Sequence, residues 1–288
     1  LFRDRAGLAR ALVDTCPHRG VRLSLGKVTP DGCLECPFHA WKFGGDGKVV
    51  HVPLNPDAKR ERLFAPTLSV RELGGVIWLW TEVNATPTTE PLVPEALLMD
   101  DVAKTYHQVE WKAHWTRAME NMLDSPHVPF VHASTIGRFV RPLLRPDSSM
   151  DIAWEDTPWG GQTTSSLDGN PAGGAALRFY KPNMMELQIP MNGKLFRMHA
   201  FCVPVDDAHV RMIIVGVRGF AKWRGLNPLF NWANQRIAEE DRRLVESSWP
   251  REVPPPGQEL SVRTDRATLQ FRKYYFAELK AADVVAPT

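Results

Sequence analysis

The sequence predicts an α+β protein in which a small all-β domain precedes a domain built on an antiparallel sheet with helices on one face. Residues 1–82 alternate short strand-like segments with turns, and residues 99–288 hold a run of strand candidates with helix candidates before and after it. Between them, residues 83–98 contain three prolines and no periodicity, which indicates a linker. We therefore expect two domains, at 1–82 and 99–288.

The elements of the first domain follow from its turn signals. Thr-Pro-Asp-Gly at 29–32 and Gly-Gly-Asp-Gly at 44–47 each predict a hairpin, and β-branched and aromatic residues fill 76–80. The expected strands are 21–25, 33–36, 41–43, 48–52, 68–71 and 75–80. The sequence starts with strand-like residues and no Met, so we expect it to begin partway through this domain, with any targeting segment lying before it.

The second domain is expected to begin with a strand at 106–111 and a helix at 115–124. Residues 134–150 contain Gly137, Pro142 and Pro146 and predict a long loop. Six strands are expected next, at 152–154, 162–166, 176–180, 184–189, 195–203 and 210–217. Two helices, at 227–246 and 267–281, are expected to follow.

The composition is that of an ordinary globular protein. The 288 residues are 43% hydrophobic with a net charge of +2, so no basic surface points to nucleic acid or to a membrane. No apolar run reaches the ~18 residues of a membrane span. The four cysteines do not form a disulfide framework, which favours a reducing, cytoplasmic setting.

Two short motifs supply Cys16, His18, Cys36 and His39, in the spacing C-x-H, seventeen residues, C-x-x-H. Zinc fingers group their ligands as a cysteine pair and a histidine pair, whereas each loop here offers one of each. That order suits a [2Fe–2S] cluster with two cysteines on one iron and two histidines on the other. A zinc ribbon remains the alternative. Cys33 is interpreted as a buried small residue between the loops.

A second group follows at Asn121, Asp124, His127 and His132. Prolines 126 and 129 interrupt the helix between the two histidines and can re-aim the second imidazole. A facial triad for non-haem Fe(II) consists of two histidines and one carboxylate. These two histidines could supply two of its three ligands, so one carboxylate remains to be found. Asp124 is spaced to accept a hydrogen bond from His127. The alternative is a pair of ordinary core or surface histidines.

The missing carboxylate is sought in the helix 227–246, which contains Glu239, Glu240 and Asp241. Helical spacing places Asp241 on the apolar face, while Glu239 and Glu240 are expected to point towards Arg242, Arg243 and solvent. A carboxylate on an apolar face is costly to bury without a partner, and an iron ion would be one. We predict Asp241 as the third ligand; a buried salt bridge is the alternative.

The loops at 16–20 and 36–41 closely resemble those of the Rieske non-haem iron (ring-hydroxylating) oxygenases, with Ala40 where that family usually has Gly. Residues 121–132 match its pattern N-x-x-D-x-x-H-x-x-x-x-H. The resemblance implies a Rieske [2Fe–2S] cluster on Cys16, His18, Cys36 and His39 and a mononuclear Fe(II) on His127, His132 and Asp241. It also implies O2 as co-substrate, with electrons from NAD(P)H reaching the chain only through a separate ferredoxin or flavin reductase.

The chain further resembles the trimeric single-subunit branch, mostly monooxygenases and demethylases of aromatic or polycyclic compounds. In a homotrimer of this kind, Asp124 would bridge His127 to His39 of the neighbouring chain, with Asn121 beside the iron. The alternatives are a cis-dihydroxylating dioxygenase α-subunit and a Rieske electron carrier without oxygenase activity. Apolar residues on the strand candidates could line a pocket, with ordinary core packing as the alternative. The other five histidines are interpreted as structural, and His199 is the one among them that is a candidate for a substrate contact. These pocket candidates are Met184, Met185, Leu187, Phe196, Met198, Phe201 and Trp232.

Overall fold

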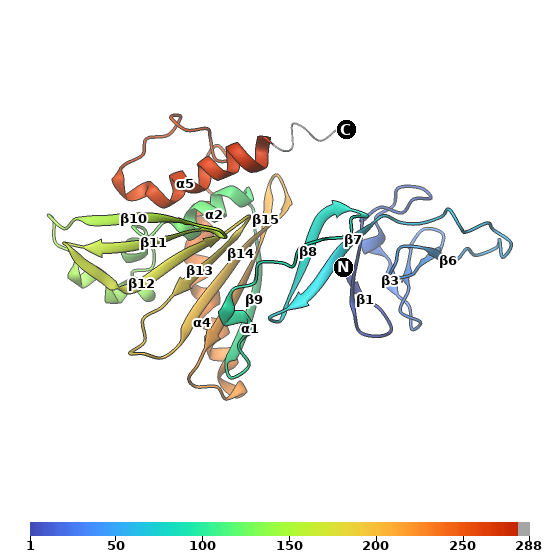
Figure 1. Cartoon of the computed structure of the whole chain (residues 1–288), viewed down its shortest axis with the longest axis horizontal. Coiled ribbons are helices and arrows are strands. Elements are labelled where there is room, and N and C mark those ends of the chain that lie inside the picture. Colours follow the sequence, from blue (N-terminus) through green and yellow to red (C-terminus); the bar gives the residue numbers. More distant parts are fainter. Residues whose placement is uncertain (282–288) are drawn as a thin grey trace. The chain divides into compact units, whose positions relative to one another are not determined.

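The computed structural model describes residues 1–281, apart from the side chains of residues 172–175. The chain divides into two compact units, Leu1–Met99 and a second unit that begins at Asp100 (Figure 1). Each unit is built on antiparallel strands, and helices lie mainly in the second. The predicted α+β class is confirmed. None of the helices within residues 1–281 is long and apolar enough to cross a bilayer.

The first unit contains two four-stranded sheets. One sheet has the order β1-β2-β7-β8, with β1 at Phe2–Arg3, β2 at Ala9–Leu12, β7 at Thr67–Leu73 and β8 at Val76–Val83. The other has the order β3-β4-β5-β6, with β3 at Lys27–Val28, β4 at Leu34–Glu35, β5 at Lys42–Phe43 and β6 at Val49–His51. Leu23, Phe43 and Ala65 are almost fully buried in a core that also contains Cys16 and Cys36.

The prediction of a strand at 21–25 is wrong. Leu23–Leu25 is a 3₁₀ helix, η1, and the strand begins only at Lys27. The backbone N–H of Gly26 donates to the Leu23 carbonyl at 2.9 Å, which closes a turn where a strand would need an extended ladder. Cys33 is half-buried rather than buried.

Part of the segment expected to be a linker is ordered. β8 runs on to Val83, and α1 at Glu95–Leu98 buries Leu97 completely. A Cβ on Gly74, in the turn between β7 and β8, would lie 2.8 Å from the Leu97 Cβ atom. Glycine at this turn, with φ of +65°, therefore lets α1 pack closely against the first unit.

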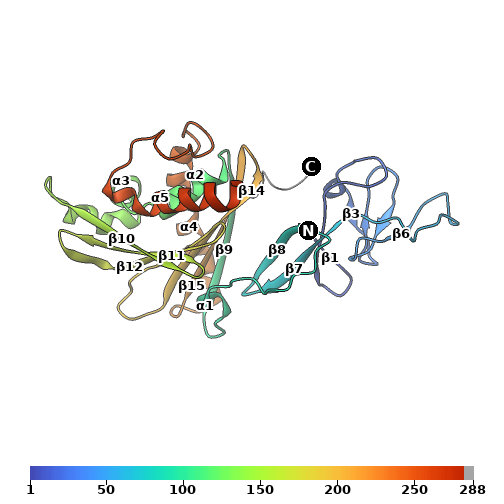
Figure 2. The same cartoon turned by 45° about the horizontal axis from the view of Figure 1, so that its top comes forward.

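The second unit is built on a seven-stranded antiparallel sheet of order β10-β11-β12-β13-β14-β15-β9. Helices α2 (Trp115–Leu123), α4 (Asn227–Val245) and α5 (Arg266–Tyr274) lie along this sheet (Figures 1 and 2). The short α3 (Val128–Val131) follows α2 in the chain, and the loop expected at 134–150 contains two 3₁₀ helices, η2 (Ile136–Phe139) and η3 (Arg141–Leu143). The strands are β9 (Ala103–Trp111), β10 (Met150–Thr157), β11 (Gly160–Leu167), β12 (Asn170–Tyr180), β13 (Met184–Gln188), β14 (Phe196–Asp206) and β15 (His209–Arg218).

Large apolar residues join the helices to the sheet. Trp111, Met119 and Phe271 are fully buried, and the Phe271 ring meets Phe179 edge-to-face at 5.7 Å between centroids. Because α2, α5 and β12 share this cluster, the end of α2 is held firmly where it approaches the candidate metal site.

A ring of four charged side chains, three of them buried and Glu259 partly exposed, ties α2 to α5. The Arg117 guanidinium donates to Glu120 at 3.2 Å and to Glu259 at 2.7 Å. Arg272 donates to Glu259 at 2.6 Å and also to Glu120. The hydrogen bond from Arg117 outweighs partial burial and, with Arg272, lowers the pKa of Glu259 to about 2. We call these four residues the charged ring.

Candidate functional site

Two loops of matching geometry present Cys16 and Cys36. In each loop the cysteine carbonyl accepts a hydrogen bond from the residue four positions later, Gly20 at 2.9 Å and Ala40 at 3.1 Å. In each, the cysteine N–H donates to the residue five positions later. Gly20 and Ala40 both have positive φ, 69° and 54°, so Ala40 adopts the left-handed conformation that glycine favours.

The side chains of these loops converge as two pairs. Cys16 and Cys36 are each 2% exposed, and burial raises the pKa of the Cys16 thiol, which a bound metal would reverse. The His18 and His39 rings lie 4.7 Å apart between centroids, and His18 stacks on Trp41 at 4.4 Å. The Nδ1 atom of His18 is buried and has no hydrogen-bond partner among the described residues, as suits an atom that binds a metal.

The pairwise arrangement distinguishes a cluster from a zinc site. A tetrahedral zinc would draw all four donor atoms into one compact cage. Within residues 1–281 the one set of three or more donors lying within 4.8 Å of one another is His127, His132 and Asp241, so the loop residues form no such cage. A sulfur pair and a nitrogen pair fit the two irons of a [2Fe–2S] cluster.

The two histidines of the second group flank a four-residue helix. α2 ends at Leu123, the chain turns at Asp124, and α3 then separates His127 from His132. Pro129 lies in the first turn of α3, where its missing N–H costs no helical hydrogen bond. The break between α2 and α3 lets two imidazoles five positions apart face one another, with 5.2 Å between ring centroids.

Asp241 reaches this pair from α4. Its carboxyl oxygen Oδ1 lies 3.2 Å from His132 Nε2 and 3.5 Å from His127 Nε2, and its side chain is 4% exposed. Donors that share one octahedral metal at about 2.1 Å lie about 3 Å apart, so the three atoms fit a single ion on one face. The structure thus brings together the three predicted ligands.

The predicted neighbours of these ligands also lie close by. The Asn121 amide Nδ2 donates to Asp241 Oδ1 at 3.4 Å, while its own Oδ1 is buried and has no partner among the described residues. His127 Nδ1 lies 3.2 Å from Asp124 Oδ2, and the Asp124 side chain is 29% exposed. We call His127, His132 and Asp241 the donor group. Asp124 therefore connects the donor group to a solvent-accessible edge of the second unit.

The expectation that Glu240 faces the neighbouring arginines and solvent is wrong, although Glu239 does pair with Arg242 at 2.7 Å. Glu240 Oε2 lies 2.9 Å from His132 Nδ1. A carboxylate only accepts hydrogen bonds, so Nδ1 carries the proton and Nε2 is free for a metal. Burial disfavours protonation of His132, but Asp241 and Glu240 outweigh it and raise the pKa of His132.

Two hydroxyl groups in turn hold Glu240. Ser134 Oγ donates to its Oε1 at 2.8 Å, and Thr135 Oγ1 donates to its Oε2 at 2.7 Å. Burial alone would raise the pKa of Glu240, but these hydroxyls and His132 lower it. Glu240 stays charged and fixes the plane of the His132 ring.

A largely apolar cavity of about 270 Å³, between the sheet and helices α2, α3 and α4, has the three donors in its wall. Met185, Leu187 and Met198 line it as predicted, whereas Met184, Phe196 and Phe201 do not. His199 does not line it either: its ring is fully buried and bonds to Glu186 at 3.0 Å, as suits a structural histidine.

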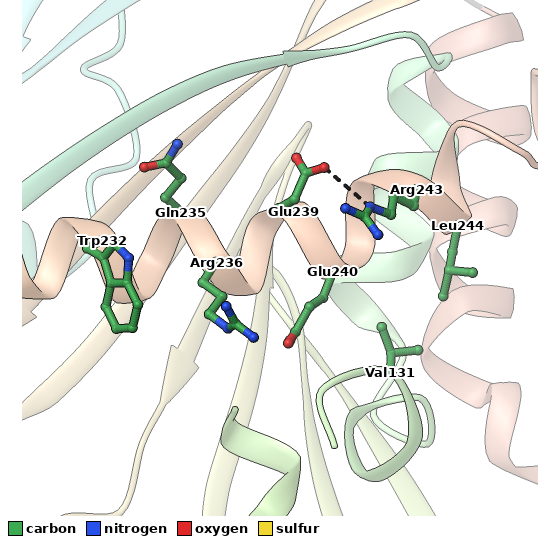
Figure 3. A pocket seen from close by; sticks show the side chains of 8 residues that line it. All are labelled: Val131, Trp232, Gln235, Arg236, Glu239, Glu240, Arg243 and Leu244. Carbon is green, nitrogen blue, oxygen red and sulfur yellow. Dashed lines mark hydrogen bonds and ion pairs between the residues drawn. The ribbon is translucent and has the colours of Figure 1, made fainter. Parts of the chain in front are cut away.

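A larger open groove of about 720 Å³ lies on the outer side of α4 (Figure 3). Trp232, predicted as a possible pocket residue, is 59% exposed there, beside Gln235 and Arg236. Of the side chains that line this groove, that of Glu240 bonds to the ring of His132. The apolar cavity, whose wall includes all three donors, is the better candidate for a reaction site.

Comparisons with known proteins match two domain families to the chain. Residues 1–68 match the Rieske [2Fe-2S] domain, and residues 111–281 match the vanillate O-demethylase oxygenase C-terminal domain. The chain is 24% identical over 279 residues to methylxanthine N3-demethylase NdmB of Pseudomonas putida, covering 92% of this chain and 76% of that protein. It is 29% identical over 278 residues to pheophorbide a oxygenase of Oryza sativa subsp. japonica, covering 85% and 51%.

Solved structures show the same fold. Dicamba monooxygenase bound to 3,6-dichlorosalicylic acid superposes with a TM-score of 0.80 at 19% identity, covering 99% of this chain and 90% of that one. The chain spans between about a fifth and about half the length of the first three curated relatives. Because the C-terminal domain family covers more than half of the sequence, this chain belongs to the Rieske non-haem iron oxygenases, an oxidoreductase family.

Proposed function

We propose that the chain is an oxygenase that uses O2 and electrons from a separate reductase to hydroxylate or demethylate a small aromatic organic substrate. The observation that carries the proposal is the position of His127, His132 and Asp241 in the wall of a largely apolar cavity. Three protein donors on one face of an ion leave the remaining positions free for small molecules.

Each group of residues has a proposed task. Cys16 and Cys36 would hold one iron of the cluster and His18 and His39 the other, and the cluster would supply one electron at a time. His127, His132 and Asp241 would hold the mononuclear iron, where O2 would be activated. The apolar walls exclude water and hold the substrate against this site.

Asp124 is the proposed connection between the two centres. It touches His127 and keeps part of its carboxyl group exposed. In the proposed homotrimer this exposed edge would receive His39 of a neighbouring chain. The electrons would come from NAD(P)H through a ferredoxin or flavin reductase.

The test is the amount of iron and acid-labile sulfide per chain, with a visible spectrum, for the wild type and for His132→Ala. We expect about three irons and about two sulfides, and the loss of one iron with an unchanged cluster spectrum in the variant. About two irons in both proteins would leave a Rieske electron carrier and refute the oxygenase. A colourless protein would indicate zinc.

A further inference from the structure

We propose that the cavity beside His127, His132 and Asp241 selects an uncharged, mostly apolar molecule of about one or two rings, anchored at its far end by Asn234. The inference rests on the proposed function for the place of the reaction. What it adds is the kind of molecule that enters the cavity, which a binding measurement can test without an activity assay.

The charge of the cavity wall is the first observation. No lysine or arginine is among the lining residues within the described part of the chain, whereas the carboxylates Asp124 and Asp241 both are. An anionic substrate would lose its hydration without gaining a cationic side chain as partner. The nearby Arg138, Arg141 and Arg145 are exposed instead. The wall therefore discriminates against carboxylates.

Asn234 is the second observation. It lies on α4 seven residues before Asp241, so both side chains share one face of the helix, about 10 Å apart along its axis. Asn234 lines the cavity, and a Cβ on Gly216 of β15 would lie 3.5 Å from its Nδ2 atom, so this amide lies beside the sheet. Its side chain has no hydrogen-bond partner among the residues described, leaving a donor and an acceptor free.

The positions of these groups define the shape of the molecule. Its hydrogen-bonding group would meet Asn234, and the carbon to be oxidised would lie at the opposite end, near Asp241. Four methionines, Met122, Met150, Met185 and Met198, supply much of the apolar wall between them and can adapt to different ring substituents.

The volume limits the size. About 270 Å³ corresponds to about nine water molecules at ~30 Å³ each, and lies just below the usual range for drug-sized ligands. A single substituted ring or a small bicyclic compound fits this space. Several relatives are named for larger molecules, such as chlorophyllide a oxygenase of Chlamydomonas reinhardtii and cholesterol 7-desaturase of Bombyx mori.

The test uses two probes of the same shape that differ in charge, para-methoxybenzamide and para-methoxybenzoate, titrated calorimetrically into the purified iron-loaded chain at neutral pH. We expect the amide to bind about tenfold or more tightly than the benzoate. Equal or tighter binding of the benzoate, or no binding of either probe at millimolar concentration, overturns the proposal.

The anchor is tested by Asn234→Leu, which keeps the side-chain size and removes both hydrogen bonds. Affinity for the amide should fall about five- to tenfold, while affinity for para-methoxytoluene, which lacks the polar group, should not fall. Gln235→Met is the matched control, because Gln235 is the next residue of α4 and lies in the outer groove (Figure 3). Unchanged amide binding in Asn234→Leu would refute the anchor.

An added positive charge gives a second test. Asn234→Lys places an ammonium group in the cavity and should shift the preference towards the benzoate, with melting temperatures showing that the variant folds. If the amide preference holds but the chain contains only two irons and consumes no O2, the proposed function fails while this inference stands. If O2 is consumed and carboxylates bind best, the proposed function stands while this inference fails.

Discussion

Replacing Glu240 by Gln tests whether this residue sets the strength of metal binding without touching the metal. Glu240 accepts hydrogen bonds from His132 and from two hydroxyls, so Gln can keep the contacts to His132 and Thr135 through its amide oxygen. Its amide NH2 would then face Ser134, whose hydroxyl can accept. The change removes the negative charge and keeps the shape.

The expected loss of iron affinity follows from the weakened hydrogen bond between His132 and residue 240. A hydrogen bond to a charged group is worth about 1.5–3 kcal/mol and a neutral one about 0.5–1.5 kcal/mol, so the loss is about 1–2 kcal/mol. That equals a fall in iron affinity of about tenfold, at the lower end of the 10–100-fold range for carboxylates that orient histidine ligands. The pKa of His132 should also move down, because Glu240 helps to raise it.

The assay is competition for Fe(II) between the protein and a chelator, read as iron retained per chain while the cluster spectrum serves as an internal standard. Glu239→Gln is the matched control, since Glu239 is the preceding residue and pairs with Arg242 and Arg243 at the surface (Figure 3). We expect no change in iron affinity there. Wild-type retention in Glu240→Gln, or equal loss in both variants, would refute the reasoning.

Three further predictions concern other parts of the second unit. Asp124→Asn should leave iron and sulfide contents unchanged while turnover falls at least about a hundredfold, because the carboxylate beside the iron site is lost; near-full turnover in that variant would contradict the proposed bridge. Gly137→Ala should lower iron retention and the melting temperature, since the new Cβ would lie 2.8 Å from the His132 carbonyl oxygen; wild-type values of both would show that the loop adapts. Glu259→Gln should lower the free energy of unfolding by about 1–2 kcal/mol at pH 7, less than the ~3 kcal/mol that its lowered pKa implies, because its carboxyl is 32% exposed. As the folded pKa lies below the unfolded one, the difference from wild type in urea unfolding should be full above pH ~4.5 and shrink towards pH ~2, and a difference that grows on acidification would refute the assignment.

The sequence predicted much of the sheet, because period-two alternation is a local signal. The strands expected at 184–189 and 210–217 agree with β13 and β15 within two residues. Strand ends were less well predicted: 152–154 became Met150–Thr157, since polar residues at the edge of a sheet carry no periodicity. At 21–25 the alternation of Leu23 and Leu25 was misleading, because local hydrogen bonds close a turn there.

The candidate site was likewise predicted only in part. Spacing along the chain and helical phase pointed to His127, His132 and Asp241, which the structure brings within 4.8 Å, although their role as ligands stays a prediction. Glu240 was misplaced because its partner His132 lies 108 positions away in the sequence. No local pattern reports a contact of that separation. The charged ring was missed for the same reason, since Arg117 and Glu259 are 142 positions apart.

Three consecutive carboxylates on α4 point in three directions, because each residue of an α-helix is rotated by about 100° from the one before it. Glu239 faces solvent, Glu240 faces His132 Nδ1 and Asp241 faces His132 Nε2. Inserting or deleting a single residue between Asn234 and Glu239 would rotate one end of the helix by about 100° relative to the other. Asn234 and Asp241 would then no longer face the same cavity. This stretch of α4 can therefore vary in composition on its outer side, but it cannot vary in length.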